Sequence, residues 1–180
     1  MARHRVFISY HHDNDQDYKE KFVELFDDYY DIFIDGSVGD GDIDDTLKTE
    51  TMRQKIRDEY LRDTTVTIVL IGRETWKRKH IDWEISSSIR DTKYNSRSGL
   101  LGILLPTHPD YGKGGFTPNI IPPRLYDNLE NGFAKIYDWT DNHSSIRQWI
   151  EIAFRDRKEI IPDNSRPMFG QNRTGDHWVD

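Results

Sequence analysis

The stretch TTVTIVLI at residues 64–71 is the strongest candidate strand in this chain, because five of its eight residues are apolar and the other three are threonine. β-Branched residues dominate this stretch, which favours a strand over a helix. A strand that is apolar on both faces is typical of a parallel sheet with helices packed on either side. We therefore place residues 64–71 at the centre of a parallel sheet.

Four other segments have the composition of strands. They are residues 5–10 (RVFISY), 32–34 (IFI), 99–105 (GLLGILL) and 133–137 (FAKIY). Each is a short apolar or aromatic run bounded by polar or turn-forming residues, and the first stops abruptly at the polar run HHDNDQD. A functional loop commonly follows a strand in this way, so the end of the first strand becomes a region of interest.

Helical periodicity fills the intervals between these strands. Apolar side chains recur at helical spacing within residues 15–30, 46–61, 81–89 and 146–154. Strands that alternate with helices imply right-handed parallel crossovers and helix layers on both sides of a sheet. The sequence therefore predicts an α/β, flavodoxin-like three-layer fold with a five-stranded, mainly parallel sheet and helices on both faces.

The length of 180 residues leaves room for one domain. We predict a single domain over residues 1–160 and a polar, loose C-terminal tail over residues 161–180. Residues 107–131 contain four of the seven prolines. We expect this segment to run irregularly over the surface with at most short helical turns.

The composition argues against several classes of function. The formal net charge of -7 repels a phosphate backbone, and no basic patch of motif strength is present, so we expect no nucleic-acid partner. With no cysteine, the chain has no disulfide and no thiolate metal site. The apolar stretch near the N-terminus falls far short of the roughly 20 residues of a membrane span. We therefore expect no membrane association and a cytoplasmic location.

The acidic segment around residue 42 resembles a calcium loop only in part. Asp40, Asp42 and Asp44 occupy its first, third and fifth positions. The sixth position holds Asp45 in place of glycine, and the twelfth holds Thr51 where a bidentate glutamate is needed. The seven histidines include no HExxH pair. We predict no metal site and interpret the segment as a solvated acidic loop.

The loops at one edge of the predicted sheet are the candidate site. In open parallel sheets, ligands bind outside the carboxyl ends of the strands, where strand order reverses. The loops after Tyr10, Ile34 and Ile71 lie there, and Glu84 follows the third. A phosphate-cradling loop would need glycines in place of HHDNDQD, and a phospho-acceptor receiver would need aspartate in place of Gly72. FMN, P-loop and receiver functions are therefore not expected.

Two segments carry a family resemblance. RVFISYHHDND resembles the opening strand and loop of TIR domains, and DTTVTIVLIGRETWKRKHIDWEI resembles their central strand, following loop and third helix. The similarity extends to the divergent TIR-like branch found as the ThsB component of Thoeris antiphage systems. In the order of its elements it covers residues 4–158.

The resemblance implies an NAD⁺-cleaving site, in which a glutamate at the start of the third helix engages the nicotinamide-side ribose. The matching position here is Glu84. Cleavage of the N-glycosidic bond leaves positive charge on the ribose, which a carboxylate stabilises. The resemblance implies no metal and no cofactor, with NAD⁺ as the substrate. From the residues alone, Glu84 can also be an ordinary first-turn acid that stabilises a helix N-terminus.

The resemblance also suggests contacts to the dinucleotide from two loops, which include a glycine-containing loop able to close over a ligand. The residues are Ser9, Tyr10, His11 and His12 after the first strand, and Asp35, Gly36 and Ser37 after the second.

The residues before Glu84 depart from the family pattern. Many TIR domains place a tryptophan four residues before the glutamate, whereas this chain has His80 there, between Trp76 and Trp83. Either tryptophan could supply an aromatic wall, and His80 could pair with phosphate. A basic cluster could hold pyrophosphate, face a neighbouring protomer or simply be solvated; it comprises Arg73, Lys77, Arg78 and Lys79.

The function that the resemblance implies is bacterial antiphage defence by an NAD⁺ glycohydrolase or cyclase. Such an enzyme would make an ADP-ribose-derived signal, cyclic or linear, for a ThsA-like effector, with a phage protein as trigger and with self-association. One alternative is a non-catalytic TIR module that acts as a scaffold through self-association. Another is a nucleoside or nucleotide hydrolase of related topology. The enzyme and the scaffold would have the same fold, but only the enzyme would depend on Glu84 for its activity.

Overall fold

A computed structural model of the chain describes residues 4–29, 31–33, 43–44 and 46–180. Within these ranges, the strands form one sheet in the order β2-β1-β3-β4-β5, and each neighbouring pair is parallel. The strands are β1 (Arg5–Ser9), β2 (Asp31–Phe33), β3 (Val66–Ile71), β4 (Gly99–Leu104) and β5 (Ala134–Asp138). The predicted α/β, flavodoxin-like class is confirmed.

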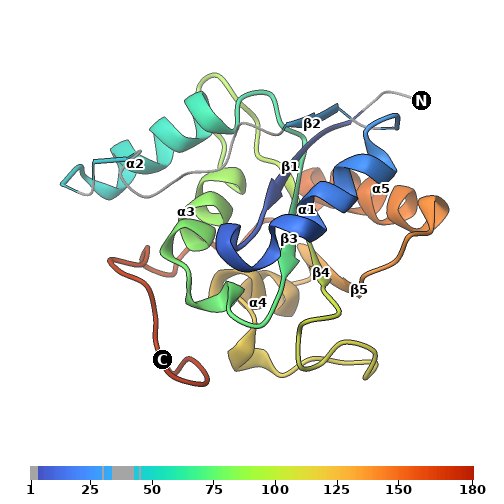
Figure 1. Cartoon of the computed structure of the whole chain (residues 1–180). Helices are drawn as coiled ribbons and strands as arrows, with labels where there is room; N and C mark the ends of the chain where they lie inside the picture. Colours follow the sequence, from blue (N-terminus) through green and yellow to red (C-terminus); the bar gives the residue numbers. More distant parts are fainter. Residues whose placement is uncertain (1–3, 30, 34–42, 45) are drawn as a thin grey trace.

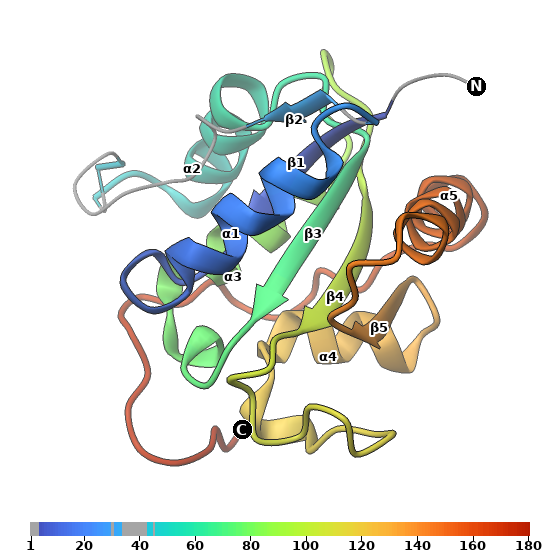
Figure 2. The same cartoon turned by 45° about the vertical axis from the view of Figure 1, so that its right-hand side comes forward.

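Helices cover both faces of the sheet (Figures 1 and 2). The longer ones are α1 (His12–Phe26), α2 (Thr49–Lys55), α3 (Lys79–Ser88), α4 (Pro123–Glu130) and α5 (His143–Glu159). Shorter turns are η1 (Ile56–Tyr60), η2 (Thr75–Lys77) and η3 (Pro118–Ile120). Helices α1 and α5 pack on one face, and α2, α3 and α4 on the other. Among these helices, none combines the length and apolarity that crossing a membrane requires.

The central strand is β3, as predicted from its composition. It pairs with β1 on one side and β4 on the other, and every one of its residues is buried. Because side chains alternate along a strand, Val66, Ile68 and Leu70 belong to the core beneath α1 and α5. Val69 and Ile71 belong to the core beneath α3 and α4. Burial on both faces explains why this strand lacks a polar alternation.

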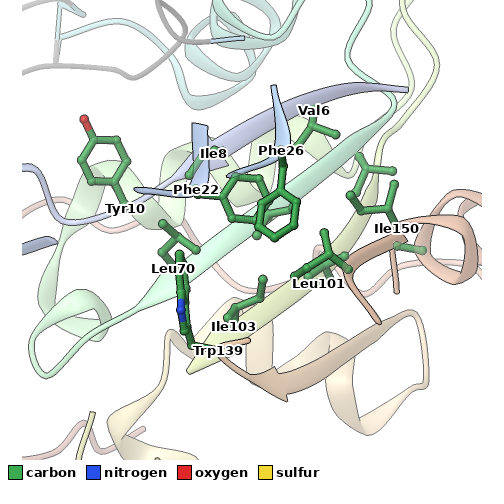
Figure 3. Packing of buried hydrophobic residues seen from close by; sticks show 14 of the residues in the cluster. Val6, Ile8, Tyr10, Phe22, Phe26, Leu70, Leu101, Ile103, Trp139 and Ile150 are labelled. Atoms are coloured by element: carbon green, nitrogen blue, oxygen red, sulfur yellow. The ribbon is translucent and has the colours of Figure 1, made fainter. Parts of the chain in front are cut away.

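The core beneath α1 and α5 is rich in aromatic side chains. Figure 3 shows Phe22 and Phe26 of α1 over the sheet, with Ile8, Leu101 and Ile150 around them. The rings of Phe22 and Phe26 lie 4.7 Å apart in a tilted arrangement. Burial of each such side chain contributes roughly 1.5–3 kcal/mol, so this layer holds the first strand and its following loop in place.

Helix α4 lies within a segment that we predicted to be irregular. We expected at most short helical turns within residues 107–131, but α4 has eight residues and buries Leu125 fully. The reason is the position of the prolines. Pro123 occupies the first helical position, where a missing N–H costs nothing and the fixed φ suits a helix. Here a proline pair begins a helix instead of preventing one.

The expectation of a loose tail is also wrong. Residues 161–180 form no helix or strand, yet Phe169 and Trp178 are buried. The indole of Trp178 donates to Ile121 O at 2.8 Å, and Arg166 pairs with Asp127 at 2.8 Å. These partners are distant in sequence, so the polar composition of the tail gives no sign of them. The division into a domain over residues 1–160 and a tail stays a prediction.

Candidate functional site

The carboxyl end of β1 lies at the point where strand order reverses. The sheet places β2 on one side of β1 and β3 on the other, which is the position where open α/β sheets bind ligands. Ser9 is the last residue of β1 and is paired with Val69 of β3. Its side chain lies on the same face as that of Phe7, which packs in one cluster with Trp83 of α3. Ser9 therefore faces α3.

Glu84 reaches this strand end from α3. Ser9 Oγ donates a hydrogen bond to Glu84 Oε2 at 2.5 Å, and the two residues are 0% and 1% exposed. Helix α3 begins at Lys79, and the acid in its first turn is Asp82. Glu84 is thus a buried carboxylate at the sheet edge, which disfavours its interpretation as an ordinary first-turn acid. Low polarity around a carboxylate strengthens its interaction with any nearby positive charge.

Tyr10 lies close to this carboxylate. Its ring is buried, and its hydroxyl donates to Gln16 Oε1 at 2.6 Å. Burial, with the charge of Glu84 as the next cause, raises the pKa of the Tyr10 phenol. Tyr10 therefore stays neutral at physiological pH. The ring of His12, which is exposed, lies 4.6 Å from the Tyr10 ring.

His11 offers a polar group without a partner at the same edge. It is buried just before α1, and its Nδ1 has no hydrogen-bond partner among the described residues. Burial lowers the pKa of the His11 imidazole, and the charge of Arg78 lowers it further. A neutral imidazole with an unused nitrogen suits a hydrogen bond to a ligand hydroxyl or amide.

Asp15 is a further buried acid at this edge, and it was not predicted from the sequence. It is 1% exposed, and its carboxyl lies so close to Gly72 that a Cβ there would meet it at 2.5 Å. Thr75 Oγ1 donates to it at 3.5 Å. Burial raises the pKa of Asp15 to about 6. In the sequence, Asp15 is one of several aspartates in an acidic run. The only local sign of its position is Gly72, which has no side chain and so leaves room for the Asp15 carboxyl.

The aromatic residues near Glu84 are mainly part of the core. Trp83 is buried, packs with Phe7 and donates its indole N–H to Phe169 O at 2.8 Å. Trp76 is buried as well, and His80 meets the Trp83 ring edge-on at 5.2 Å. Neither tryptophan presents an open ring face to solvent here.

The residues of the basic cluster before α3 make different contacts. Lys77 pairs with Glu74 at 3.0 Å, and Lys79 lies 5.0 Å from the centre of the Trp83 ring. Arg78 is the member whose charge acts on His11. Arg78 is therefore the cation of this cluster with the clearest relationship to the candidate site.

The C-terminal tail fixes the helix that carries Glu84. Asp82, two residues before Glu84, forms a buried ion pair with Arg124 of α4 at 2.9 Å and accepts the backbone N–H of Phe169 at 2.9 Å. Arg124 also donates to Pro167 O at 3.1 Å. The tail is thereby joined to both α3 and α4, and it holds the segment before Glu84 in a single arrangement.

Several residues named from the sequence lie outside the described ranges. They include the proposed loop residues Asp35, Gly36 and Ser37 and three members of the acidic segment, Asp40, Asp42 and Asp45. Over the described part of the chain, no group of three or more His, Asp or Glu side chains is arranged to hold a metal ion. The structure thus brings together Ser9, Tyr10 and Glu84, with His11 and His12 next to them at the start of α1.

The residues of this edge fall within a stretch that matches a known family. The family described as Thoeris protein ThsB, TIR-like domain, matches residues 7–110. That stretch extends from β1 to the loop after β4 and includes Ser9, Asp15 and Glu84. No curated protein matches the chain.

Proposed function

Because the chain belongs to the TIR-like domain family of Thoeris protein ThsB, we propose that it acts in antiphage defence by cleaving NAD⁺. Family membership supports the role in Thoeris defence. The proposal adds the reaction, with Glu84 as the catalytic carboxylate and an ADP-ribose-derived product, cyclic or linear. That product would activate a ThsA-type effector.

The observation that carries this proposal is the buried Glu84 carboxylate at the end of β1, held by Ser9. Cleavage breaks the bond between ribose C1′ and the pyridinium nitrogen. The bonding electrons go to that nitrogen, and neutral nicotinamide leaves. A carboxylate beside the ribose stabilises the positive charge that remains. Water then supplies a hydroxyl to C1′ and releases a proton, or a nucleophile within the molecule closes a ring.

The neighbouring residues have separate proposed roles. Tyr10, His11 and His12 would contact the dinucleotide, and the unused nitrogen of His11 supports this. His80 would pair with phosphate, whereas Trp76 and Trp83, both buried, are better assigned to the core than to an aromatic wall at the ligand. Ser9 is better assigned as a residue that positions Glu84, because its hydroxyl is already engaged with that carboxylate.

The loop after β2 has a role proposed from the sequence alone. Asp35, Gly36 and Ser37 would close over the ligand, since glycine permits the backbone conformations that such a closure needs. The reaction needs no metal or further cofactor, because the pyridinium is already a good leaving group.

An infection experiment tests the function and separates it from a scaffold. Cells that carry the chain and a ThsA-type effector are challenged with phage, and ADP-ribose-derived products are measured by mass spectrometry. The enzyme account predicts protection and a product in the wild type, with both lost in Glu84→Gln. Glu24→Gln changes an exposed acid on α1 and should keep both. Protection by Glu84→Gln without any product would instead support a module that acts by self-association.

A further inference from the structure

The amino end of the sheet, away from Glu84, has a hollow surface that the proposed reaction does not use. Two adjoining hollows of about 260 Å³ and about 240 Å³ share Ser96 and Arg157. Thr64 and Thr65 come just before β3, and Ser96 comes shortly before β4. Because all the strands are parallel, these residues lie at the opposite end of the sheet from Ser9. We call the two together the amino-end hollow.

Positive charge gathers in the amino-end hollow although the whole chain carries a net charge of -7. Its basic residues are Arg57, Arg97, Arg157 and Lys158, and its acids are Asp63 and Asp91. Asp91 pairs with Arg97, one of these four cations, at 3.2 Å, and Asp63 lies 3.6 Å from Arg5, which is not part of the hollow. Over the described residues, three of the four cations therefore have no carboxylate within 4.0 Å.

Two of these cations are arginines with unsatisfied buried donors. Arg57 is 1% exposed and donates to backbone carbonyls, including those of Leu61 and Thr64. Its Nε and the Nε of Arg157 have no hydrogen-bond partner among the described residues. Burial lowers the pKa of Arg57 to about 10, with the charge of Asp58 opposing this shift and that of Arg157 adding to it, so Arg57 stays protonated at neutral pH. Unpaired buried donors of this kind often mark the place of a missing water or ion.

The Arg157 guanidinium is held in a fixed position. It stacks on the Phe154 ring at 4.2 Å and donates to Arg97 O at 3.1 Å, while Arg97 Nε donates to Arg157 O at 2.7 Å. A planar guanidinium fixed in this way is suited to a phosphate group, because little side-chain entropy remains to be lost on binding. The exposed hydroxyl residue Ser96 lies beside it in both hollows.

The larger hollow adds an aromatic surface. Tyr94 lines it and is 70% exposed, which is unusual for a large ring in this chain. An exposed ring next to a cationic hollow is suited to stacking of a nucleobase. Each hollow is smaller than the roughly 300 Å³ at which small-molecule sites begin, so a nucleotide would have to span both.

We propose that the amino-end hollow binds a nucleoside phosphate, with its phosphate against Arg157, Lys158 and Ser96 and its base on the ring of Tyr94. Arg157 lines both hollows and lies at their junction, so it is the residue on which the site depends most. The inference is independent of the reaction at Glu84, since it rests on residues at the other end of the sheet.

A titration with ADP tests this site, because ADP contains the base and phosphates but no nicotinamide bond. Backbone amide shifts of the full chain, recorded by NMR, should move saturably at residues 94–97 and 157–158. Arg157→Ala should weaken ADP binding about ten-fold, as expected for the loss of a charge-assisted hydrogen bond. Arg155→Ala is the matched control, because Arg155 lies on the same helix and pairs with Asp156 at 3.1 Å.

Simpler probes and a second variant complete the test. Inorganic phosphate and adenosine should each shift the same amides more weakly than ADP, because each offers only part of the contacts. If Arg157→Ala does not fold, Lys158→Ala, which changes an exposed side chain, should weaken ADP binding about three-fold. The proposal is overturned if millimolar ADP leaves these amides unmoved, if adenosine binds as well as ADP, or if the folded variants bind as the wild type does.

Discussion

Ser9 Oγ and Glu84 Oε2 lie 2.5 Å apart, and this hydrogen bond joins the last residue of β1 to α3 across 75 positions of sequence. Both residues are buried, so water does not replace either partner. The bond fixes the Glu84 carboxylate to a strand inside the sheet, next to the central strand β3. A catalytic group held by rigid elements keeps its geometry better than one carried on a loop.

Ser9→Ala should therefore lower kcat for nicotinamide release about ten-fold and change KM by less than about two-fold, because one hydrogen bond to a charged group is lost. Ser87→Ala is a matched control on α3: its hydroxyl is buried and has no partner among the described residues. It should leave both constants unchanged. Equal losses in the two variants, or a loss confined to KM, would contradict the positioning role.

Arg124→Met should unfold at a lower temperature, because it leaves the buried Asp82 carboxylate without its cation. Removing one partner of a buried pair costs about 3–5 kcal/mol, or roughly 10 °C in Tm. Arg124→Met/Asp82→Leu should recover part of this loss, since the unpaired charge is gone. Arg62→Met, at an exposed pair with Asp63, should change Tm by less than about 1 °C. Calorimetry measures all three, and a Tm for Arg124→Met equal to that of wild type would refute the account.

Asp15 should make stability depend on pH. Burial raises the pKa of Asp15 from its ordinary 3.8 to about 6, so the folded protein binds the proton more tightly than the unfolded chain does. The contribution of Asp15 to the free energy of unfolding therefore falls as the pH rises between these two pKa values. Asp15→Asn should match wild type below about pH 4 and exceed its Tm by roughly 6 °C at about pH 8.

Thermal melts of Asp15→Asn across pH check this prediction, with Asp17→Asn as a control. Asp17 lies on the same helix but is exposed, so its replacement should leave the pH dependence of wild type unaltered. If the Tm difference between Asp15→Asn and wild type stays constant with pH, the Asp15 carboxyl is not the source of the pH dependence of stability.

The fold was predictable where burial is visible in local sequence. The central strand β3 lacks polar alternation, and the apolar stripe of α5 repeats at helical spacing, so both were placed correctly. The helix that begins at Pro123 was missed, because proline usually breaks a helix and only its position at the start makes it favourable. The packing of Phe169 and Trp178 was missed, because their partners are distant in sequence.

The candidate site was predictable in position but not in detail. Parallel topology alone places Tyr10 and Glu84 at one sheet edge, and the structure brings them together with Ser9. Sequence could not show that Ser9 binds the carboxylate of Glu84, because the contact depends on the strand register and on which face of α3 meets β1. Nor could it distinguish Asp15 from the other aspartates of its run.

Nicotinamide release by purified wild type and Glu84→Gln is the most direct test of the central claim, since glutamine keeps the shape and removes the charge. The assay is also run in lysate from phage-infected cells, where any trigger is present. We predict release in at least one setting, and a fall of at least about 100-fold in Glu84→Gln. Equal release by the two proteins, or no Glu84-dependent release in either setting, would contradict the account.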